Sequence, residues 1–185
     1  MIKRAVFIFL SFYFLSNSIF AQSDSLAKLS IGNIFTVSFP SQYNHTLATM
    51  RENYEGNYND ITYSLFISEE FAYSSISNTI ELDSLYGLIL HNILSIYSGE
   101  FIESKTYYTE FGQLRGLYVS VKSTTKENPY EAEYYTVCVN GKIYVMSTTY
   151  LATAGEKVAK QAKDFVNTIH FNPSLTWQDQ MNVRK

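Results

Sequence analysis

The residues able to do nucleophilic chemistry are few in this sequence. Cys138 is the only cysteine among 185 residues, and it stands between two valines in an apolar segment. A reactive cysteine needs a neighbouring cation, a helix N-terminus or a general base, and no histidine is near Cys138 in the sequence. We therefore predict that Cys138 is a small buried hydrophobic side chain.

The three histidines show none of the short spacings at which metal ligands usually occur; they are His45, His91 and His170. His91 falls on the polar side of a predicted helix. His170 directly follows a second predicted helix, where a histidine complements the negative helix end. No metal and no other cofactor is predicted.

Two carboxylate pairs are close in sequence: Glu69 with Glu70, and Glu131 with Glu133. Alternate residues of a strand share a face, so Glu131 and Glu133 are predicted to project from the same side. Nothing near them indicates the apolar pocket that raises the pKa of a catalytic acid. Neither a Gly-x-Ser-x-Gly motif nor a phosphate-binding loop occurs. We predict solvated carboxylates and no catalytic residue.

The segment Asn53–Asp60 is rich in side-chain oxygen atoms that calcium prefers. Only two of these side chains are charged, and the order of residues is not that of a calcium-binding hand. A solvated connection between strands is the prediction, and whether it binds calcium stays open. The residues concerned are Asn53, Glu55, Asn57, Asn59 and Asp60.

Tyrosine is unusually frequent, with 16 residues in the chain. Tyrosine suits both sheet packing and binding interfaces. Packing is predicted for most of them, and whether some form a binding surface stays open. Those in the later predicted strands are Tyr107, Tyr108, Tyr130, Tyr134, Tyr135, Tyr144 and Tyr150.

Alternation of apolar and polar residues predicts a sheet of several strands. A polar, turn-rich connection is expected at 51–60, and a linker at 22–30. The predicted strands are 35–39, 46–51, 61–68, 101–111, 114–122, 130–139 and 142–150.

Two amphipathic helices are predicted from apolar residues at helical spacing. The first runs from 82 to 97 and begins either at Asn78, with Glu81 completing a capping box, or at Asp83. The second begins at a capping box formed by Thr153 and Glu156. Its inner face consists of Val158, Ala162, Phe165, Val166 and Ile169.

The dipeptide Asn140-Gly141 predicts a two-residue hairpin turn. Apolar side chains then occupy both faces of the hairpin, which a sheet with one solvated face would not show. The simplest arrangement covers each face with a helix: a three-layer α/β/α sandwich of the α+β class, around a mainly antiparallel sheet. The predicted pairs are Cys138 with Ile143, Val137 with Tyr144, Thr136 with Val145 and Tyr135 with Met146.

A family resemblance follows from this order of elements. A first strand ending in Phe-Pro (FTVSFP), a meander and a central helix lead to GKIYVMSTTYLATAGEKVAKQAKDFVNTIHF. Over about residues 34–171 the chain resembles the PsbP-like family, whose α/β/α fold is shared with the Ran-binding Mog proteins. The resemblance implies one domain at 31–172, followed by a flexible tail at 173–185. It also implies a binding or accessory role, with no metal or partner site carried over.

The N-terminus has the layout of a secretory signal peptide. Two basic residues precede an apolar run, a polar Ser-Asn-Ser interruption follows, and the small Ala21 suits the last position before cleavage. An uncleaved anchor would need roughly 20 predominantly apolar residues. Gln22 follows the expected cut, so no lipoprotein is predicted. We expect a secreted or periplasmic protein with residues 1–21 removed and no membrane span remaining.

Taken together, these patterns predict an exported, non-enzymatic binding or accessory domain of the cell envelope. The formal net charge of −3 gives no electrostatic reason to bind nucleic acid. The expected partner is an unknown envelope protein or a small ligand, bound at a sheet edge or a tyrosine-bearing surface. Two alternatives remain. A START-like carrier would hold an apolar ligand in a cavity between the sheet and the C-terminal helix. A hydrolase with an unrecognised site would gather three polar side chains in one cleft.

Overall fold

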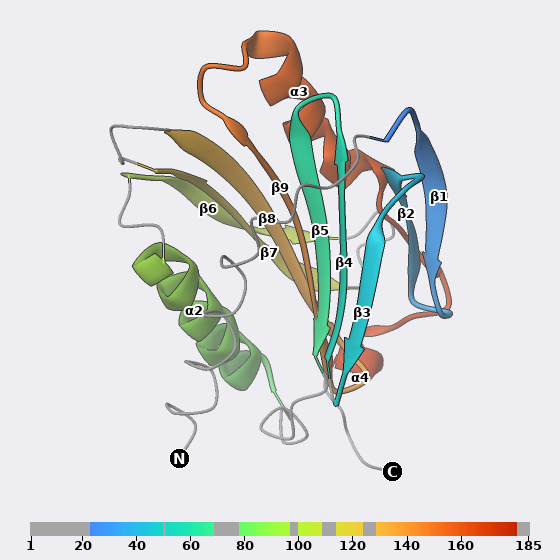
Figure 1. The fold of residues 1–185 in the computed structure, drawn as a ribbon. Coiled ribbons are helices and arrows are strands. Elements are labelled where there is room, and N and C mark those ends of the chain that lie inside the picture. Colours follow the sequence, from blue (N-terminus) through green and yellow to red (C-terminus); the bar gives the residue numbers. More distant parts are fainter. Residues whose placement is uncertain are drawn as a thin grey trace.

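A computed structural model describes residues 23–49, 51–68, 78–96, 100–108, 114–123 and 129–180. A broad twisted sheet forms its centre (Figure 1), with a helix across one face and further elements against the other. The predicted signal peptide at 1–21 and the pair Glu69 and Glu70 lie outside the described residues.

The central sheet has seven strands, and every adjacent pair is antiparallel, which confirms the predicted sheet type. Its two edges are β3 and β6. In spatial order the strands are β3 (Asn44–Ala48), β4 (Arg51–Tyr58), β5 (Ile61–Ser68), β9 (Lys142–Leu151), β8 (Tyr130–Val139), β7 (Arg115–Lys122) and β6 (Glu100–Tyr108).

The hairpin of β8 and β9 turns at Asn140 and Gly141, whose φ angles are 52° and 74°. Both angles are positive, as the two central residues of a type I′ turn require, and asparagine and glycine tolerate them best. Cys138 pairs with Ile143 and Tyr135 with Met146, which confirms the predicted register. Both faces of this hairpin are buried, as the apolar pattern predicted.

One face of the sheet is covered by helix α2 (Thr79–Ile96). The N–H of Glu81 donates to Oδ1 of Asn78 over 3.0 Å, so Asn78 is the residue that caps the helix. Apolar side chains from α2 and from four strands form a single buried cluster there: Leu82, Leu85, Tyr86, Ile89, Ile93, Phe66, Leu117, Val119, Val121, Ala132, Tyr134, Cys138, Ile143 and Val145.

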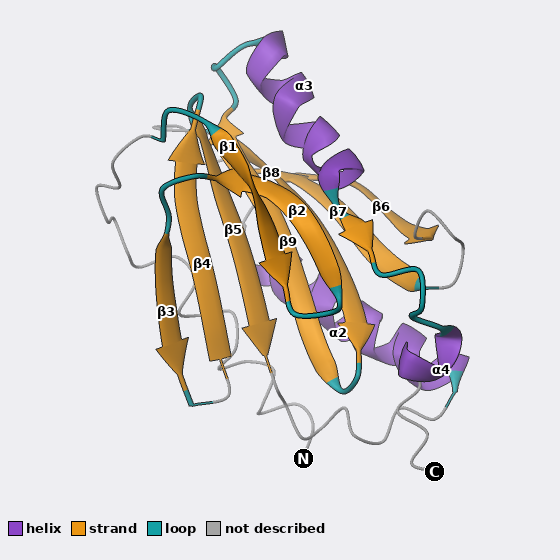
Figure 2. Ribbon diagram, turned by 90° about the vertical axis from the view of Figure 1, so that its right-hand side faces the viewer, coloured by secondary structure: helices purple, strands orange, loops and turns teal. Residues whose placement is uncertain are grey.

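The opposite face is covered by two kinds of element (Figure 2), whereas the sequence predicted a helix alone. Helix α3 (Glu156–Asp164) continues into the 3₁₀ helix η2 (Phe165–Thr168). Beside them lies a three-stranded sheet in the order β1-β2-β10, formed by Leu26–Ile31, Phe35–Pro40 and His170–Phe171. Seven strands span about 30 Å, but one helix covers only about 10 Å. On this face, the small sheet covers the part that α3 and η2 leave bare.

The N-cap residue of α3 is Gly155, which has a φ of 91° and provides no side-chain cap. The predicted capping box at Thr153 and Glu156 is therefore wrong. The predicted inner face is confirmed, since Ala162, Phe165 and Ile169 are buried in the core and Val158 and Val166 pack against it.

The segment predicted as a polar connection at 51–60 is instead strand β4 and its turn to β5. Tyr54 and Tyr58 pack against the core from one side of the strand. Between them, a Cβ on Gly56 would lie only 2.8 Å from the carbonyl oxygen of Gln42 and 2.9 Å from Cβ of Pro40. Glycine therefore lets β2 cross close above β4, and the alternation was hidden because this position has no side chain.

The predicted linker at 22–30 is wrong for its second half. Residues Leu26–Ile31 form β1, which pairs with β2 from Leu26 opposite Pro40 to Ile31 opposite Phe35. Its side chains are only partly buried, because it is the outer strand of the small sheet. That position explains its weak apolar pattern.

The predicted flexible tail at 173–185 is docked on the domain as far as Gln180. Residues Trp177–Gln180 form the short helix α4. The buried Gln180 amide donates to the carbonyls of Arg115 (2.8 Å) and Cys138 (3.1 Å) and accepts the N–H of Arg115 (2.8 Å). This side chain satisfies backbone groups where β7 begins and β8 ends.

None of the helices within the described ranges has the length and apolar character needed to cross a bilayer.

Candidate binding pocket

Cys138 lies under helix α2 and is 3 % exposed. Burial raises the pKa of its thiol well above the usual range, so the reactive thiolate is disfavoured. The prediction of a buried hydrophobic side chain is confirmed.

The three histidines stand on separate elements, β3, α2 and β10, and all are exposed. His45 stacks on the ring of Tyr54 with centroids 4.2 Å apart. Among the residues that the structure describes, no three His, Cys, Asp or Glu side chains are placed to hold a metal ion.

The oxygen-rich residues at 53–60 are separated by the geometry of β4. Asn53, Glu55 and Asn57 project from one side of the strand, while Asn59 and Asp60 form the turn, both with positive φ angles. Burial raises the pKa of Glu55, against the effect of a hydrogen bond from Asn53.

Packing accounts for many of the tyrosines, as predicted. Two of them, Tyr118 and Tyr135, are also part of a polar cluster described below. The tyrosines buried in the two core clusters are Tyr63, Tyr86, Tyr118, Tyr134, Tyr135, Tyr144 and Tyr150.

Glu133 is the most unusual side chain on the sheet, because it is 0 % exposed. The hydroxyl of Tyr118 donates to its Oε2 over 2.5 Å, while its Oε1 has no hydrogen-bond partner. Burial raises the pKa of this carboxyl, although the Tyr118 hydrogen bond, the neighbouring Ser120 hydroxyl and the charge of Lys163 act in the other direction. The prediction that Glu133 is solvated is therefore wrong.

Glu131 shares the face of Glu133, as the alternation predicted, but it remains partly exposed. It accepts the hydroxyl of Tyr150 over 2.7 Å and forms a salt bridge of 3.4 Å with Lys122. The two carboxylates thus have different surroundings: one is paired with a cation near solvent, and the other is buried beside a phenol.

Ser120 lies directly opposite Glu133 in the pairing of β7 with β8. It is 2 % exposed, and its Oγ also lacks a hydrogen-bond partner. Two buried oxygen atoms without partners therefore lie on neighbouring strands. Most buried polar groups are paired, so such atoms call for a physical explanation.

A pocket of about 360 Å³ opens above this cluster, between strands β6 to β8 and the end of α3 with η2. Its floor is formed by the buried Tyr118, Ser120 and Tyr135. The residues that line the pocket are Glu103, Lys105, Tyr118, Ser120, Tyr135, Lys163 and Val166.

Hydroxyl groups of the sheet fix the end of α3 over the pocket. Thr148 Oγ1 donates to the carbonyl of Ala162 over 3.1 Å, and the Tyr135 hydroxyl donates to the carbonyl of Lys163 over 3.3 Å. Both carbonyls are in the last turn of the helix, where some lack intrahelical partners. Lys163 is held at the pocket in this way.

The rim of the pocket is charged and exposed. The ammonium of Lys105 lies 3.2 Å from the carboxylate of Glu103 and 4.6 Å from the ring centroid of Tyr118. Lys163 contributes a second ammonium from the opposite side. Strands β6 and β7 and helix α3 are far apart in sequence, so spacing could not reveal this arrangement.

The arrangement is suited to recognition. Apolar ring faces, a few fixed polar groups and charges at the rim are typical of small-molecule sites. Nucleophilic catalysis would require a base that accepts the Ser120 proton. Glu133 lies opposite Ser120, but burial favours the protonated form of its carboxyl, which cannot act as that base. Burial and the bond to Glu133 raise the pKa of Tyr118, so its phenolate is disfavoured.

A match among solved structures is informative about the fold. The cyanobacterial PsbP protein (CyanoP) from Synechocystis sp. PCC 6803 aligns with a TM-score of 0.55 and 13 % identity, over 80 % of this chain and 92 % of that one. The chain has the PsbP fold. The predicted α+β class and the resemblance to PsbP-like proteins are thus confirmed for the fold, while such low identity shows no shared activity.

Two other solved structures align less well. A protein of unknown function from Pseudomonas aeruginosa, described as a putative regulator, aligns with a TM-score of 0.42 and 10 % identity, over 75 % of this chain and 94 % of that one. A Bacteroides thetaiotaomicron protein aligns with a TM-score of 0.40 and 12 % identity, over 76 % and 46 %. No family model and no curated protein matches the sequence.

Proposed function

We propose that this protein is an exported, non-enzymatic binding domain of the cell envelope, and that the pocket beside α3 is its binding site. The observation that carries the proposal is the pocket's construction. Two buried tyrosines and a buried serine without a hydrogen-bond partner form its floor, and charged side chains surround its mouth. Export is inferred from the predicted signal peptide.

The pocket's size and rigidity both support this function. Its volume of about 360 Å³ is within the range of small-molecule sites. Its floor lies on paired strands, and α3 is fixed to them by two hydrogen bonds. A site on rigid elements loses little conformational entropy when a ligand binds, which favours affinity.

The START-like alternative requires a continuous apolar cavity between the sheet and the C-terminal helix. Side chains occupy the space under the first turns of α3 and under η2, where Tyr63 contacts Phe165 with ring centroids 5.3 Å apart. Ala162, Phe165 and Met146 are buried in the same cluster. This packing favours a compact ligand near the end of α3 over a long apolar chain.

The hydrolase alternative is favoured by one observation, since more than three polar side chains do meet in the pocket. Its chemistry would depend on Ser120 or Tyr118, with Glu133 as the neighbouring base. Burial favours the protonated form of Glu133, which cannot accept a proton. We therefore treat turnover as an outcome of the test below.

Binding of a protein partner at a sheet edge is a second candidate. Strand β3 is an edge of the large sheet, all five of its side chains are exposed, and Leu47 is 73 % exposed. Such an edge can accept a further strand. The test is a pull-down from envelope extract with the mature protein and with Leu47→Lys, because lysine on an edge strand opposes pairing. A partner lost from the variant would support this candidate.

The pocket is tested by titrating isotope-labelled mature protein with the low-molecular-weight fraction of the producing cell's envelope extract. We expect saturable changes in the amide NMR signals of Ser120, Lys163 and Val166. The matched variant is Val166→Trp, which places a larger side chain at the pocket wall and should abolish these changes. Its melting temperature shows whether it remains folded.

Two results would contradict the proposed function. In one, the fraction shifts signals elsewhere and leaves the pocket signals unchanged in the wild-type protein. In the other, mass spectrometry shows that the protein converts a component of the fraction, and Ser120→Ala abolishes the conversion.

A further inference from the structure

We propose that the pocket takes a small organic acid, whose carboxylate meets Lys105 and Lys163 and whose ring-sized apolar body contacts Tyr118, Tyr135 and Val166. This inference rests on the proposed function and adds the chemical class of the ligand.

The charges at the rim of the pocket favour an anionic ligand. The rim holds two ammonium groups and one carboxylate. Glu103 and Lys105 form a salt bridge with each other, and within the described part of the chain Lys163 takes part in none. A ligand carboxylate therefore gains a charge-assisted hydrogen bond to Lys163 without displacing a protein partner.

The walls of the pocket favour a ligand with a flat apolar ring. The ring centroids of Tyr118 and Tyr135 lie 5.0 Å apart, with an angle of 39° between the ring planes. Val166, from η2, lines the same pocket. Flat apolar groups pack well against aromatic faces. Since the pocket is near the lower limit for small-molecule sites, a ligand with one ring fits better than a long chain.

Two carboxylates oppose an anionic ligand: Glu103 at the rim, which is paired with Lys105, and Glu133 beneath the floor. The position of Glu133 limits its effect. It is completely buried, and the Tyr118 hydroxyl that donates to it is itself part of the pocket floor. A ligand therefore meets the phenol and not the carboxylate. Burial also raises the pKa of Glu133, which reduces its negative charge. At the mouth, the two exposed lysines outnumber the single exposed carboxylate of Glu103.

Three probes of equal ring size separate the ligand classes: benzoate, benzyl alcohol and benzylamine. Each is titrated into the mature protein while amide signals of Ser120, Lys163 and Val166 are followed. We expect benzoate to bind at least about fivefold more tightly than the neutral alcohol, the ratio expected for one charge-assisted hydrogen bond. Benzylamine should bind more weakly than either.

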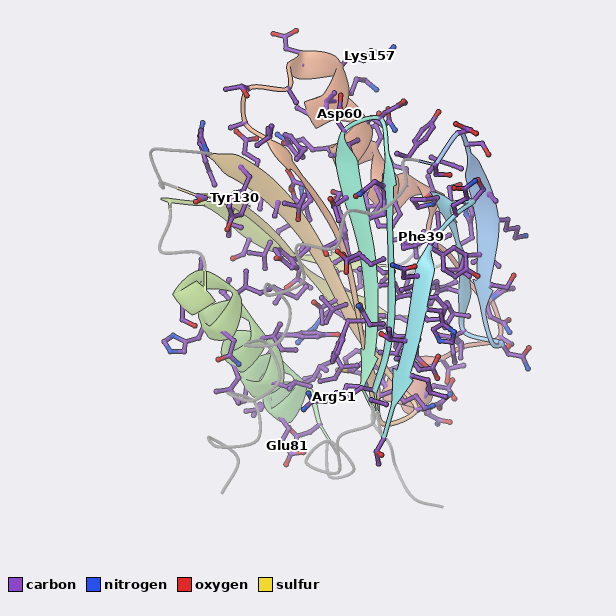
Figure 3. The ribbon with its side chains drawn as sticks, viewed as in Figure 1. Phe39, Arg51, Asp60, Glu81, Tyr130 and Lys157 are labelled. Carbon is purple, nitrogen blue, oxygen red and sulfur yellow. The ribbon has the colours of Figure 1, made fainter. Side chains whose placement is uncertain are left out.

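Lysine variants show whether the charge at the rim causes this preference. Lys163→Gln should weaken benzoate binding about fivefold and leave benzyl alcohol binding unchanged. The control is Lys157→Gln, the same change at the outer end of α3 (Figure 3) and outside the pocket lining. It should leave benzoate binding unchanged.

The outcomes distinguish the two proposals. Tighter binding of benzylamine or benzyl alcohol than of benzoate at the pocket overturns the acid and keeps the pocket. Pocket signals that respond to the envelope fraction but to no probe also overturn the ring-sized acid alone. If neither the probes nor the fraction affect the pocket signals, both proposals fail.

Discussion

The two faces of the central sheet are built from the same strands, yet they differ in how their side chains are covered. Under α2, residues such as Leu117, Val119 and Cys138 pack directly against a helix that lies across the strands. Under α3, the alternate residues Tyr118, Ser120 and Glu133 carry buried oxygen atoms, and a pocket opens beside the helix. The first face therefore stabilises the fold, whereas the second holds polar groups that packing alone does not require.

The largest predicted effect concerns Cys138 on the α2 face. Its thiol should react with a soluble thiol reagent at least about a thousandfold more slowly in the native protein than in urea, because reaction requires an opening of the core. Absorbance of the released reagent measures both rates. A native rate close to the unfolded rate would show that α2 does not seal this face.

The next effect is the loss of packing under α2. Replacing Ile93, which is 1 % exposed, with alanine should lower the free energy of unfolding by about 2–5 kcal/mol. Urea denaturation measures the loss. The control is Ile80→Ala on the same helix, where 75 % exposure predicts a change within about 0.5 kcal/mol. Equal losses for the two variants would contradict the assignment of faces.

Glu133 on the α3 face should behave differently, because its substitution removes a buried group whose charged form is unfavourable. Burial raises the folded-state pKa of its carboxyl, so above the unfolded pKa the folded protein binds more protons, and stability falls as pH rises. Glu133→Gln removes this dependence while leaving an acceptor for Tyr118. Relative to the wild-type protein, the variant should therefore gain stability as pH rises from 4 to 7.

The expected size of that gain is about 1–2 kcal/mol, the usual range for one buried polar group. Thermal denaturation across the pH series measures it. Because Glu55 is present in both proteins, its own raised pKa cancels in the difference. A difference that does not change with pH, or a variant that loses stability as pH rises, would contradict a burial-raised pKa.

The last prediction tests the hydroxyl of Tyr118 at the pocket floor. Tyr118→Phe keeps the ring but leaves Oε2 of Glu133 without its donor. We expect a loss of about 1–3 kcal/mol above pH 7, where the carboxylate most needs the donor, and a smaller loss at pH 4. Tyr108→Phe, at the end of β6 where the side chain is 64 % exposed, provides the comparison and should change stability little.

The sequence was sufficient for elements whose pattern follows local rules. Asn140-Gly141 predicted the hairpin and its register because the turn leaves only one pairing. Asn78 was one of two predicted starts of α2, and its cap, which needs only four residues, is the one observed. Strand β4 was missed because Gly56 interrupts its alternation and the neighbouring residues are polar. Tyr54 and Tyr58 were the signal of its core-facing side.

The pocket itself was beyond prediction from sequence, for a physical reason. The alternation placed Glu131 and Glu133 on one face, which was right, but their burial depends on which strands lie beside them. Ser120 faces Glu133 only through pairing of β7 with β8, and Lys163 reaches the site only because α3 folds back over the sheet. Contacts between residues so distant in sequence leave no local signal.

The most direct test of the central claim is a crystal structure of the mature protein grown with the low-molecular-weight envelope fraction. The pocket proposal predicts electron density for a compact molecule against Tyr118 and Tyr135, with an anionic group at Lys163, and no such density in Val166→Trp crystals. Density for a bound molecule elsewhere, with the pocket filled only by water, would contradict it.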